Sequence, residues 1–555
     1  MSVAKGKMQW SIHGRLLLAG GLMLLSLTGL SVWNCMPIYP DEIAFRMQLG
    51  RYIQDQGVVQ GLYPLCASNI KETPFFFVIP AWIFSQLDLA FSSVAMRIFP
   101  LTAVLLSLSL VIWRAALKGM RPAASVVATT AVIGVAGSGL ILARYEYIQI
   151  VNLGCCLLAF YALDSPSNRP IARFLLLVPL LLISSLFSLY AHPQGLLFLP
   201  LTVYLFYRLV HPALGNLRTA LLALIVFGVL ARGAIIFHHS NCVEYPEIVQ
   251  FWDRMTFNWN EFEVVRFVDW MAVKLDRYLL SFQYIDNYAI NYLPGITVEN
   301  GWPQNLLAIL NQSIRFILCV NLLLSIFVNL VVIAVMMKRY GQRHKIMCEP
   351  LVATSLDQVR IMSLLLALPL IFLFFYDAAH NFYRSFLLNF LIAIQLAIYL
   401  SQLRLTSFRK ISNVYFGLCG TIVLSSLTVN FWWFTDRLRA GYEGPSISMQ
   451  QDWDNIDRDV KSLTQDCSMD LSRNGGIVVD DMTYDSLKKY SHVYAATYIA
   501  LSAELTRLPM SDVLGKIGPN YAVARCDTFR SVGIPIQRSR NELCCTNFIA
   551  TNSVY

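Results

Sequence analysis

Long apolar runs separated by short polar connections dominate the chain up to residue 434. Many of these runs reach about 18 residues, the length that an α-helix needs to cross the hydrocarbon core of a bilayer. The pattern therefore predicts a polytopic α-helical membrane protein with about eleven transmembrane helices. The predicted spans cover residues 16–33, 99–117, 125–143, 147–163, 174–189, 195–210, 219–237, 315–337, 361–376, 385–401 and 413–434.

Basic residues gather in every second connection between these spans. Lysine and arginine are enriched in cytoplasmic loops, so the pattern fixes an orientation. We expect a multi-pass protein of the bacterial inner membrane, with a cytoplasmic N-terminus and a periplasmic C-terminal domain. The basic positions are Lys5, Lys7, Arg15, Arg114, Lys118, Arg121, Arg169, Arg173, Arg208 and Arg218, together with those in 338–345 and 404–410.

Composition agrees with this architecture. The chain has 555 residues, of which 56% are hydrophobic and only 14% charged, and this excludes an ordinary soluble domain. The formal net charge is +9. Because the basic residues follow the topology, the surplus does not indicate binding to nucleic acid.

The composition changes sharply after residue 434, which predicts two domains, 1–434 in the membrane and 435–555 outside it. The segments "GGIVVDDMTYDSL" and "NYAVARCD" read as strands, and "YAATYIALSAEL" between them reads as a helix. A small soluble α/β domain follows from this alternation. Asp480 and Asp481 end the first strand and could contact a ligand, although turn formation is the commoner role.

Cysteines also distinguish the C-terminal segment. Cys467, Cys526, Cys544 and Cys545 all follow the last predicted span, where an oxidising compartment would preserve disulfides. No CxxC pair occurs in this segment, so we do not expect a metal cluster there.

The first outer connection begins with an acidic pair. In "PIYPDEIAFR", Asp41 and Glu42 follow Pro40 at the start of an amphipathic stretch, and a second apolar stretch covers 74–91. Both stretches are typical of helices lying in the membrane interface. The carboxylates either cap the first helix through its positive N-terminal end or serve a chemical role.

Three other outer turns carry candidate functional residues. Each set also has a structural interpretation: an interfacial ion pair, a loop histidine, and an arginine that extends to the interface. The predicted topology brings all three turns to one membrane face with Asp41. The residues are Arg144 and Glu146 in "LARYEYIQI", His192 in "SLYAHPQGLLFLP", and Asp377, His380, Tyr383 and Arg384 in "YDAAHNFYRSFLL".

These features together resemble the glycosyltransferase-C superfamily. That superfamily includes protein O-mannosyltransferases, aminoarabinose transferases and oligosaccharyltransferase catalytic subunits. The resemblance rests on the topology of residues 16–434, the acidic pair after the first span and the second acidic site after the third. It implies an integral membrane enzyme that takes a sugar from a polyprenyl phosphate or pyrophosphate and transfers it on the outer side. The acceptor would be a glycan, a glycolipid such as lipopolysaccharide carrying O-antigen, or a protein.

The resemblance also implies roles for the candidate residues. Asp41 would act as general base, with Glu42 and Glu146 in the catalytic set, and the anomeric configuration would invert. His192 departs from the family, which often has lysine at this turn. A divalent cation (Mg, Mn or Ca) could bind Asp41, Glu146 and His192, although no spacing demands one. Contacts to the donor phosphate would come from Arg384, His192, Tyr383, His380 and Arg144.

Two other functional classes compete with this interpretation. A polysaccharide polymerase or ligase would also use a lipid-linked sugar, but it usually lacks a discrete C-terminal domain and has a large late loop rich in Arg and His. A secondary transporter would show ionisable residues or broken helices near the membrane midplane. The predicted spans contain almost no charge there.

Overall fold

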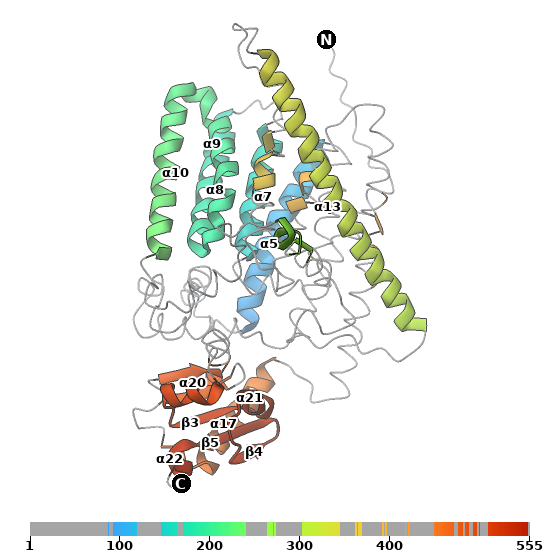
Figure 1. The fold of residues 1–555 in the computed structure, drawn as a ribbon. Helices are drawn as coiled ribbons and strands as arrows, with labels where there is room; N and C mark the ends of the chain where they lie inside the picture. Colours follow the sequence, from blue (N-terminus) through green and yellow to red (C-terminus); the bar gives the residue numbers. More distant parts are fainter. Residues whose placement is uncertain are drawn as a thin grey trace. The chain divides into compact units, whose positions relative to one another are not determined.

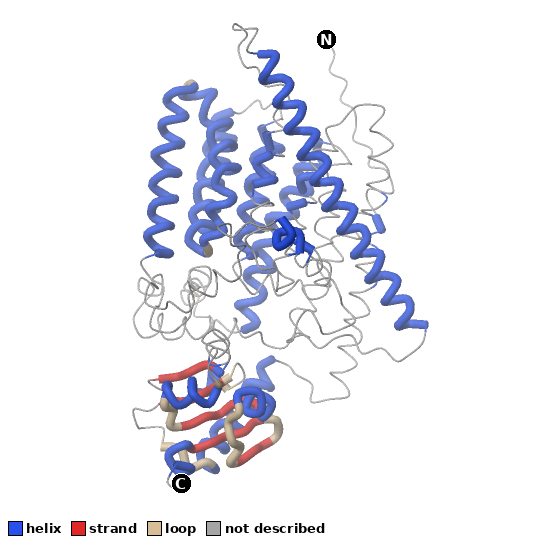
Figure 2. The backbone as a smooth tube through the Cα atoms, in the orientation of Figure 1, coloured by secondary structure: helices blue, strands red, loops and turns tan. Residues whose placement is uncertain are grey.

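The computed structural model describes part of the chain. The described residues are 87, 93–118, 146–163, 170–239, 264–269, 271–272, 302–343, 361–362, 364–368, 391–392, 394–396, 417, 420–421, 424, 428, 449–470, 476–480, 483–487, 492–496, 499 and 509–552. The chain divides into two compact units, and the division near the C-terminus falls between Ala440 and Gly441. The described part of the first unit is helical, and all described strands belong to the second (Figure 2).

Consecutive helices form the best described part of the first unit (Figure 1). They are α7 (Glu146–Leu163), α8 (Pro170–Ala191), the short 3₁₀ helix η3 (Pro193–Phe198), α9 (Leu199–Leu214) and α10 (Asn216–His239), and α5 (Ser93–Lys118) precedes them. Short turns make chain neighbours antiparallel. Nearly every described side chain of α7 is buried, as expected for a helix surrounded by other helices.

The described helices agree with the predicted spans in this region. Among the described residues, three apolar segments are long enough to cross a membrane: Phe174–Ala191, Gln194–Leu214 and Asn216–Ile236. Exposed leucine, isoleucine and valine side chains along α10 suit contact with lipid tails. The spans predicted at 16–33 and 125–143 lie outside the described residues, and those at 361–376, 385–401 and 413–434 are described only in fragments. The total of about eleven therefore stays a prediction.

Helix α13 corrects one predicted boundary. It covers Trp302–Arg343, 42 residues, whereas the sequence predicted a span at 315–337 preceded by an outer loop reaching Gln312. A helix of this length extends about 63 Å, roughly twice the hydrocarbon thickness of a bilayer. The predicted span covers the apolar middle of this helix, because hydropathy marks where a helix leaves the lipid and does not mark where its backbone hydrogen bonds end.

The second unit contains a five-stranded mixed sheet in the order β2-β1-β3-β5-β4. Strand β1 (Gly476–Val479) pairs in parallel with β2 (His492–Ala495) and with β3 (Tyr521–Arg525). Strand β5 (Leu543–Asn547) pairs antiparallel with β3 and with the edge strand β4 (Arg538–Arg540). The predicted strands at "GIVV" and "YAVAR" are confirmed.

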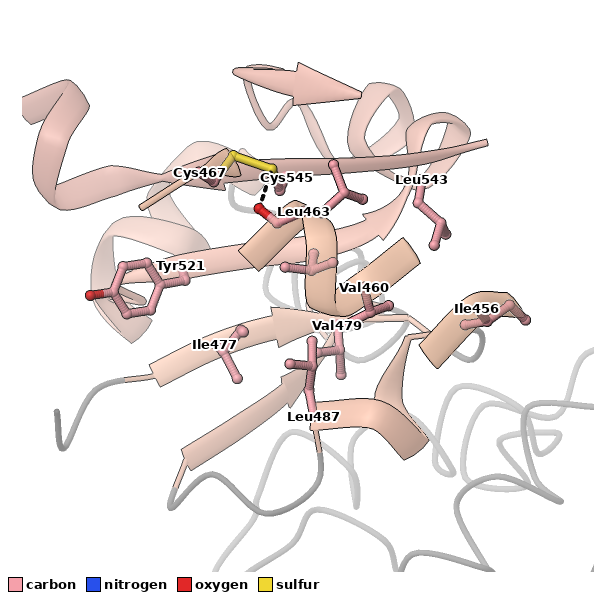
Figure 3. Packing of buried hydrophobic residues seen from close by; sticks show 11 residues of the cluster. Ile456, Val460, Leu463, Cys467, Ile477, Val479, Leu487, Tyr521, Leu543 and Cys545 are labelled. Carbon is pink, nitrogen blue, oxygen red and sulfur yellow. Dashed lines mark hydrogen bonds between the residues drawn. A yellow bond between two sulfur atoms is a disulfide. The ribbon is translucent and has the colours of Figure 1, made fainter. Parts of the chain in front are cut away.

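Helices cover both faces of this sheet. On one face, α17 (Met449–Asp466) and α18 (Tyr484–Leu487) pack Val460, Leu463 and Leu487 against alternate strand residues (Figure 3). On the other face, α20 (Met510–Ile517) and α21 (Cys526–Val532) pack against the strand residues whose side chains point to that side, such as Val478 and Ala522. The short α22 (Phe548–Asn552) follows β5. The predicted α/β class is therefore confirmed for this segment.

One predicted element in this unit is wrong in part. The sequence suggested a helix from Tyr494, but Tyr494 and Ala495 end strand β2, and helical residues are described only from Ala496. The ring of Tyr494 lies against Gly476 of β1, at a distance that leaves no room for a Cβ. Cross-strand packing of an aromatic residue thus overrides local helical propensity.

Candidate functional site at the α8–η3 turn

A stripe of polar side chains runs along one face of α7. Gln149, Asn152 and Cys156 are spaced so that they lie on the same side of the helix. The Gln149 amide donates to the Ser188 carbonyl at 3.2 Å and accepts from the Ser188 hydroxyl. The Ser184 hydroxyl donates to Asn152 at 2.9 Å. All four of these α7 and α8 residues are buried, so a polar group left without a partner would weaken the contact between the two helices.

These contacts fix the register between α7 and α8. Gln149 is level with Ser188 and Asn152 with Ser184, so the helices are antiparallel. Continuing this register by one turn brings Glu146, the first residue of α7, level with the end of α8 at Ala191. His192 follows directly. The structure thus places the start of Glu146's helix and the His192 turn at the same end of the pair.

The turn after α8 is held tightly. His192 is half-buried and has an extended backbone, and its Nδ1 accepts from the backbone N–H of Gln194 at 3.2 Å. The Gly195 N–H donates to the His192 carbonyl at 2.9 Å. A side chain at Gly195 would collide with the backbone of Ser188. Because Nδ1 is an acceptor here, a neutral His192 ring carries its proton on Nε2.

The other predicted site residues lie outside the described residues. The structure therefore does not test whether they join Glu146 and His192. They are Asp41, Glu42, Arg144, Asp377, His380, Tyr383 and Arg384.

Sequence reasoning missed a second buried polar cluster. Asn321, Ser325 and Asn329 recur every four residues on one face of α13. Ser325 donates to Gln395 Oε1, and the Gln395 amide donates to Asn329 Oδ1 at 2.7 Å. The four-residue spacing was a signal in the sequence. Interhelical amide and hydroxyl contacts of this kind hold membrane helices together where apolar contacts give little preference.

Asp480 acts as a structural centre in the second unit. It is buried at the end of β1, and its Oδ2 accepts from the Arg525 N–H at 2.8 Å, from Arg525 Nε at 3.1 Å and from Thr528 Oγ1 at 3.0 Å. Its Oδ1 accepts from the Thr483 N–H at 3.2 Å. These bonds tie the β1 turn to the end of β3. Of the two roles considered for Asp480, the structure shows the turn-forming one.

No protein-family model and no curated protein matches this sequence. Among solved structures there is a match. The chain is similar to ArnT from Cupriavidus metallidurans, whose crystal structure was solved bound to undecaprenyl phosphate. The alignment covers 96% of this chain and 98% of that chain, with 12% sequence identity and a TM-score of 0.46.

Proposed function

We propose that this protein is a membrane glycosyltransferase that uses a polyprenyl-phosphate sugar as donor and works on the outer face of the membrane. The observation that carries the proposal is the placement of Glu146 and His192. The start of α7 at Glu146 and the His192 turn lie at one end of the α7–α8 pair, and buried hydrogen bonds between the two helices fix that register. The two disulfides of the C-terminal unit support its location in an oxidising compartment.

The reaction is a single displacement. An acceptor hydroxyl oxygen forms a bond to the anomeric carbon while the bond from that carbon to the phosphate oxygen breaks, which inverts the configuration. The Asp41 carboxylate takes the hydroxyl proton, with Glu42 and Glu146 in the same acidic set. The leaving phosphate keeps the bonding electron pair. Charged and polar donors, Arg384 above all, stabilise the developing negative charge.

His192 fits a donor role better than a metal-ligand role. Its Nδ1 already accepts from Gln194, so a neutral ring presents an N–H at Nε2, which suits a phosphate oxygen. A metal bound at Nε2 would require the proton on Nδ1, where it would face the Gln194 N–H. A divalent cation would therefore be held by carboxylates such as Asp41 and Glu146, and would supply positive charge to the leaving phosphate.

The proposal includes a donor class and an acceptor class. A polyprenyl-phosphate-linked sugar is the donor class, and lipopolysaccharide or another cell-surface glycolipid is the acceptor class that we favour. The membrane supplies both in one plane, which suits a site at the outer ends of transmembrane helices. Decoration of O-antigen is the cellular process that matches these substrates.

The test is a transfer assay with the purified full chain in lipid nanodiscs. A panel of radiolabelled polyprenyl-phosphate sugars would be offered with extracted surface glycolipid. Asp41→Asn is expected to lower turnover by about 10²- to 10⁴-fold while donor binding persists. Asp55→Asn makes the same chemical change in the same predicted outer segment and should leave the rate unchanged. An unchanged rate for Asp41→Asn would refute the assigned base, and no transfer of any sugar by wild type would refute the proposed activity.

A further inference from the structure

Strand β5 carries two adjacent cysteines to opposite faces of the C-terminal sheet. Successive side chains of a strand point to opposite sides, so Cys544 and Cys545 belong to different cores. Cys545 is bonded to Cys467, directly after α17, whereas Cys544 is bonded to Cys526, the first residue of α21. Figure 3 shows the first of these bonds beside the α17 core. Each disulfide thus fastens one helical layer to the same strand.

The apolar pattern of β5 does little to determine which face each cysteine takes. All five residues of the strand, "LCCTN", are buried. A slip of one residue against β3 would exchange Cys544 and Cys545 between the faces, and each core would still receive a cysteine. Asn547 is one anchor of the native register, because its Nδ2 donates to the carbonyls of Cys467 and Ser468 at 3.2 Å each.

The native pairing is also nested along the chain. Cys467 pairs across a separation of 78 residues, and the Cys526–Cys544 bond, with a separation of 18, lies inside that loop. Four cysteines allow three pairings. As the segment enters an oxidising compartment from its N-terminal side, Cys467 and Cys526 meet the oxidant first. A Cys467–Cys526 bond would leave Cys544 and Cys545 to pair with each other. The third pairing joins Cys467 to Cys544 and Cys526 to Cys545, and it would fix the slipped strand covalently.

We propose that the C-terminal unit is a substrate of a thiol–disulfide isomerase in the compartment that it faces. A thiolate of the isomerase attacks one sulfur of a wrong disulfide, forming a mixed disulfide and releasing a thiolate of this chain. That thiolate attacks the chain's second disulfide and frees another thiolate, which attacks the mixed disulfide at the chain's sulfur and releases the isomerase thiolate unchanged. The number of disulfides is the same before and after, so the exchange consumes no oxidant or reductant.

Burial explains why exchange would end at the native pairing. Cys467, Cys544 and Cys545 are fully buried in the folded unit, whereas Cys526 is half-buried. Attack on a disulfide needs access to one of its sulfurs. Mispaired chains cannot complete both cores and stay open to attack, while the folded unit buries both partners of the Cys467–Cys545 bond and one partner of the Cys526–Cys544 bond. This inference does not depend on the proposed sugar transfer.

The test is to produce the full chain in two matched hosts, one with its disulfide isomerase and one without it. Disulfides would be mapped by mass spectrometry of non-reduced peptides from the purified protein. We expect native pairing to dominate in the first host and mispaired species to replace part of it in the second. An equal native fraction in both hosts would overturn the proposal. The absence of these disulfides in both hosts would overturn it as well.

Paired cysteine variants supply the control. Cys526→Ala with Cys544→Ala leaves Cys467 and Cys545, which can pair in only one way within the segment, so the isomerase should make no difference. If the first variant fails to fold, Cys467→Ala with Cys545→Ala serves as the control, because it leaves only Cys526 and Cys544 to pair within the segment. An isomerase variant lacking its resolving cysteine should trap wild type as a mixed disulfide and should not trap the paired variants. Equal trapping of all three would contradict the proposal.

Discussion

The α7–α8 pair and the C-terminal sheet are held together by different forces. Between α7 and α8, buried hydrogen bonds from Gln149 and Asn152 set the register. In the sheet, two apolar cores and two disulfides hold the layers. Apolar contacts select little between helices already surrounded by lipid, so polar and small residues must specify the pairing. In water, burial of apolar surface drives the layers together, and cross-links restrict the unfolded chain.

The largest loss of stability is expected when the disulfide that closes the longer loop is removed. Cys467→Ala with Cys545→Ala opens a loop of 78 residues and should lower the free energy of unfolding of the C-terminal unit by about 4 to 5 kcal/mol on chain-entropy grounds. Opening the loop of 18 residues with Cys526→Ala and Cys544→Ala should cost about 3 kcal/mol. Urea-dependent proteolysis of the full chain would measure both. A larger cost for the shorter loop would contradict the entropic account.

Asp480 is a buried charged residue in a unit that is otherwise held mainly by apolar contacts. Asp480→Asn places an amide donor among groups that donate to the carboxylate, including the Arg525 N–H and Nε. Removing one partner of a buried ion pair costs about 3 to 5 kcal/mol, and we expect a loss near the lower end because Arg525 is partly exposed. The same proteolysis assay applies. Asp466→Asn, at an exposed position, is the matched control and should leave stability unchanged.

Gly195 tests the close approach in the membrane pair. Gly195→Ala directs a methyl group at the Ser188 carbonyl and should cost about 1 to 3 kcal/mol, the usual range for overpacking. Gly228→Ala on α10 meets nothing within 4 Å and should be neutral. Thermal aggregation of the detergent-solubilised protein would compare the two. Equal melting temperatures would show that the His192 turn is not packed closely against α8.

The smallest expected effect is that of a single buried hydrogen-bonding side chain in the membrane pair. Gln149→Leu removes both contacts with Ser188. Interhelical hydrogen bonds in membranes contribute about 0.6 kcal/mol on average and up to about 1.7 kcal/mol. We expect a loss in that range, because Ser188 can turn its hydroxyl to a backbone carbonyl of its own helix. A loss comparable to that of Asp480→Asn would erase the distinction between the two regions.

Much of this fold could be predicted because hydrophobic periodicity is a local signal. The spans near α8, α9 and α10 and the strands β1 and β3 were found in that way. Tyr494 was misassigned because its partner Gly476 lies in another strand, and local propensity cannot report that contact. The disulfide pairing could not be read either, because Cys544 and Cys545 are adjacent and only the strand register separates them.

The membership of the candidate site stays a prediction, and the structure describes the relative level of only two of its positions. Glu146 and His192 were selected by their places in the expected topology, but their common level depends on Gln149 meeting Ser188 across two helices. The acceptor role of His192 Nδ1 depends on the turn that Gly195 permits. Neither contact has a local sequence signature. Tertiary register therefore decides how the predicted residues could act together.

A double-mutant cycle on Glu146 and His192 tests the central claim most directly. Glu146→Gln removes the charge, and His192→Asn removes the imidazole while keeping a side chain able to cap the turn. Transfer from the polyprenyl-phosphate sugar would be measured as kcat/KM for wild type, both single variants and the double variant. One shared site predicts a coupling energy of about 0.5 to 3 kcal/mol, whereas independent sites add within about 0.5 kcal/mol. Additive losses would contradict the account, and so would full activity in the double variant.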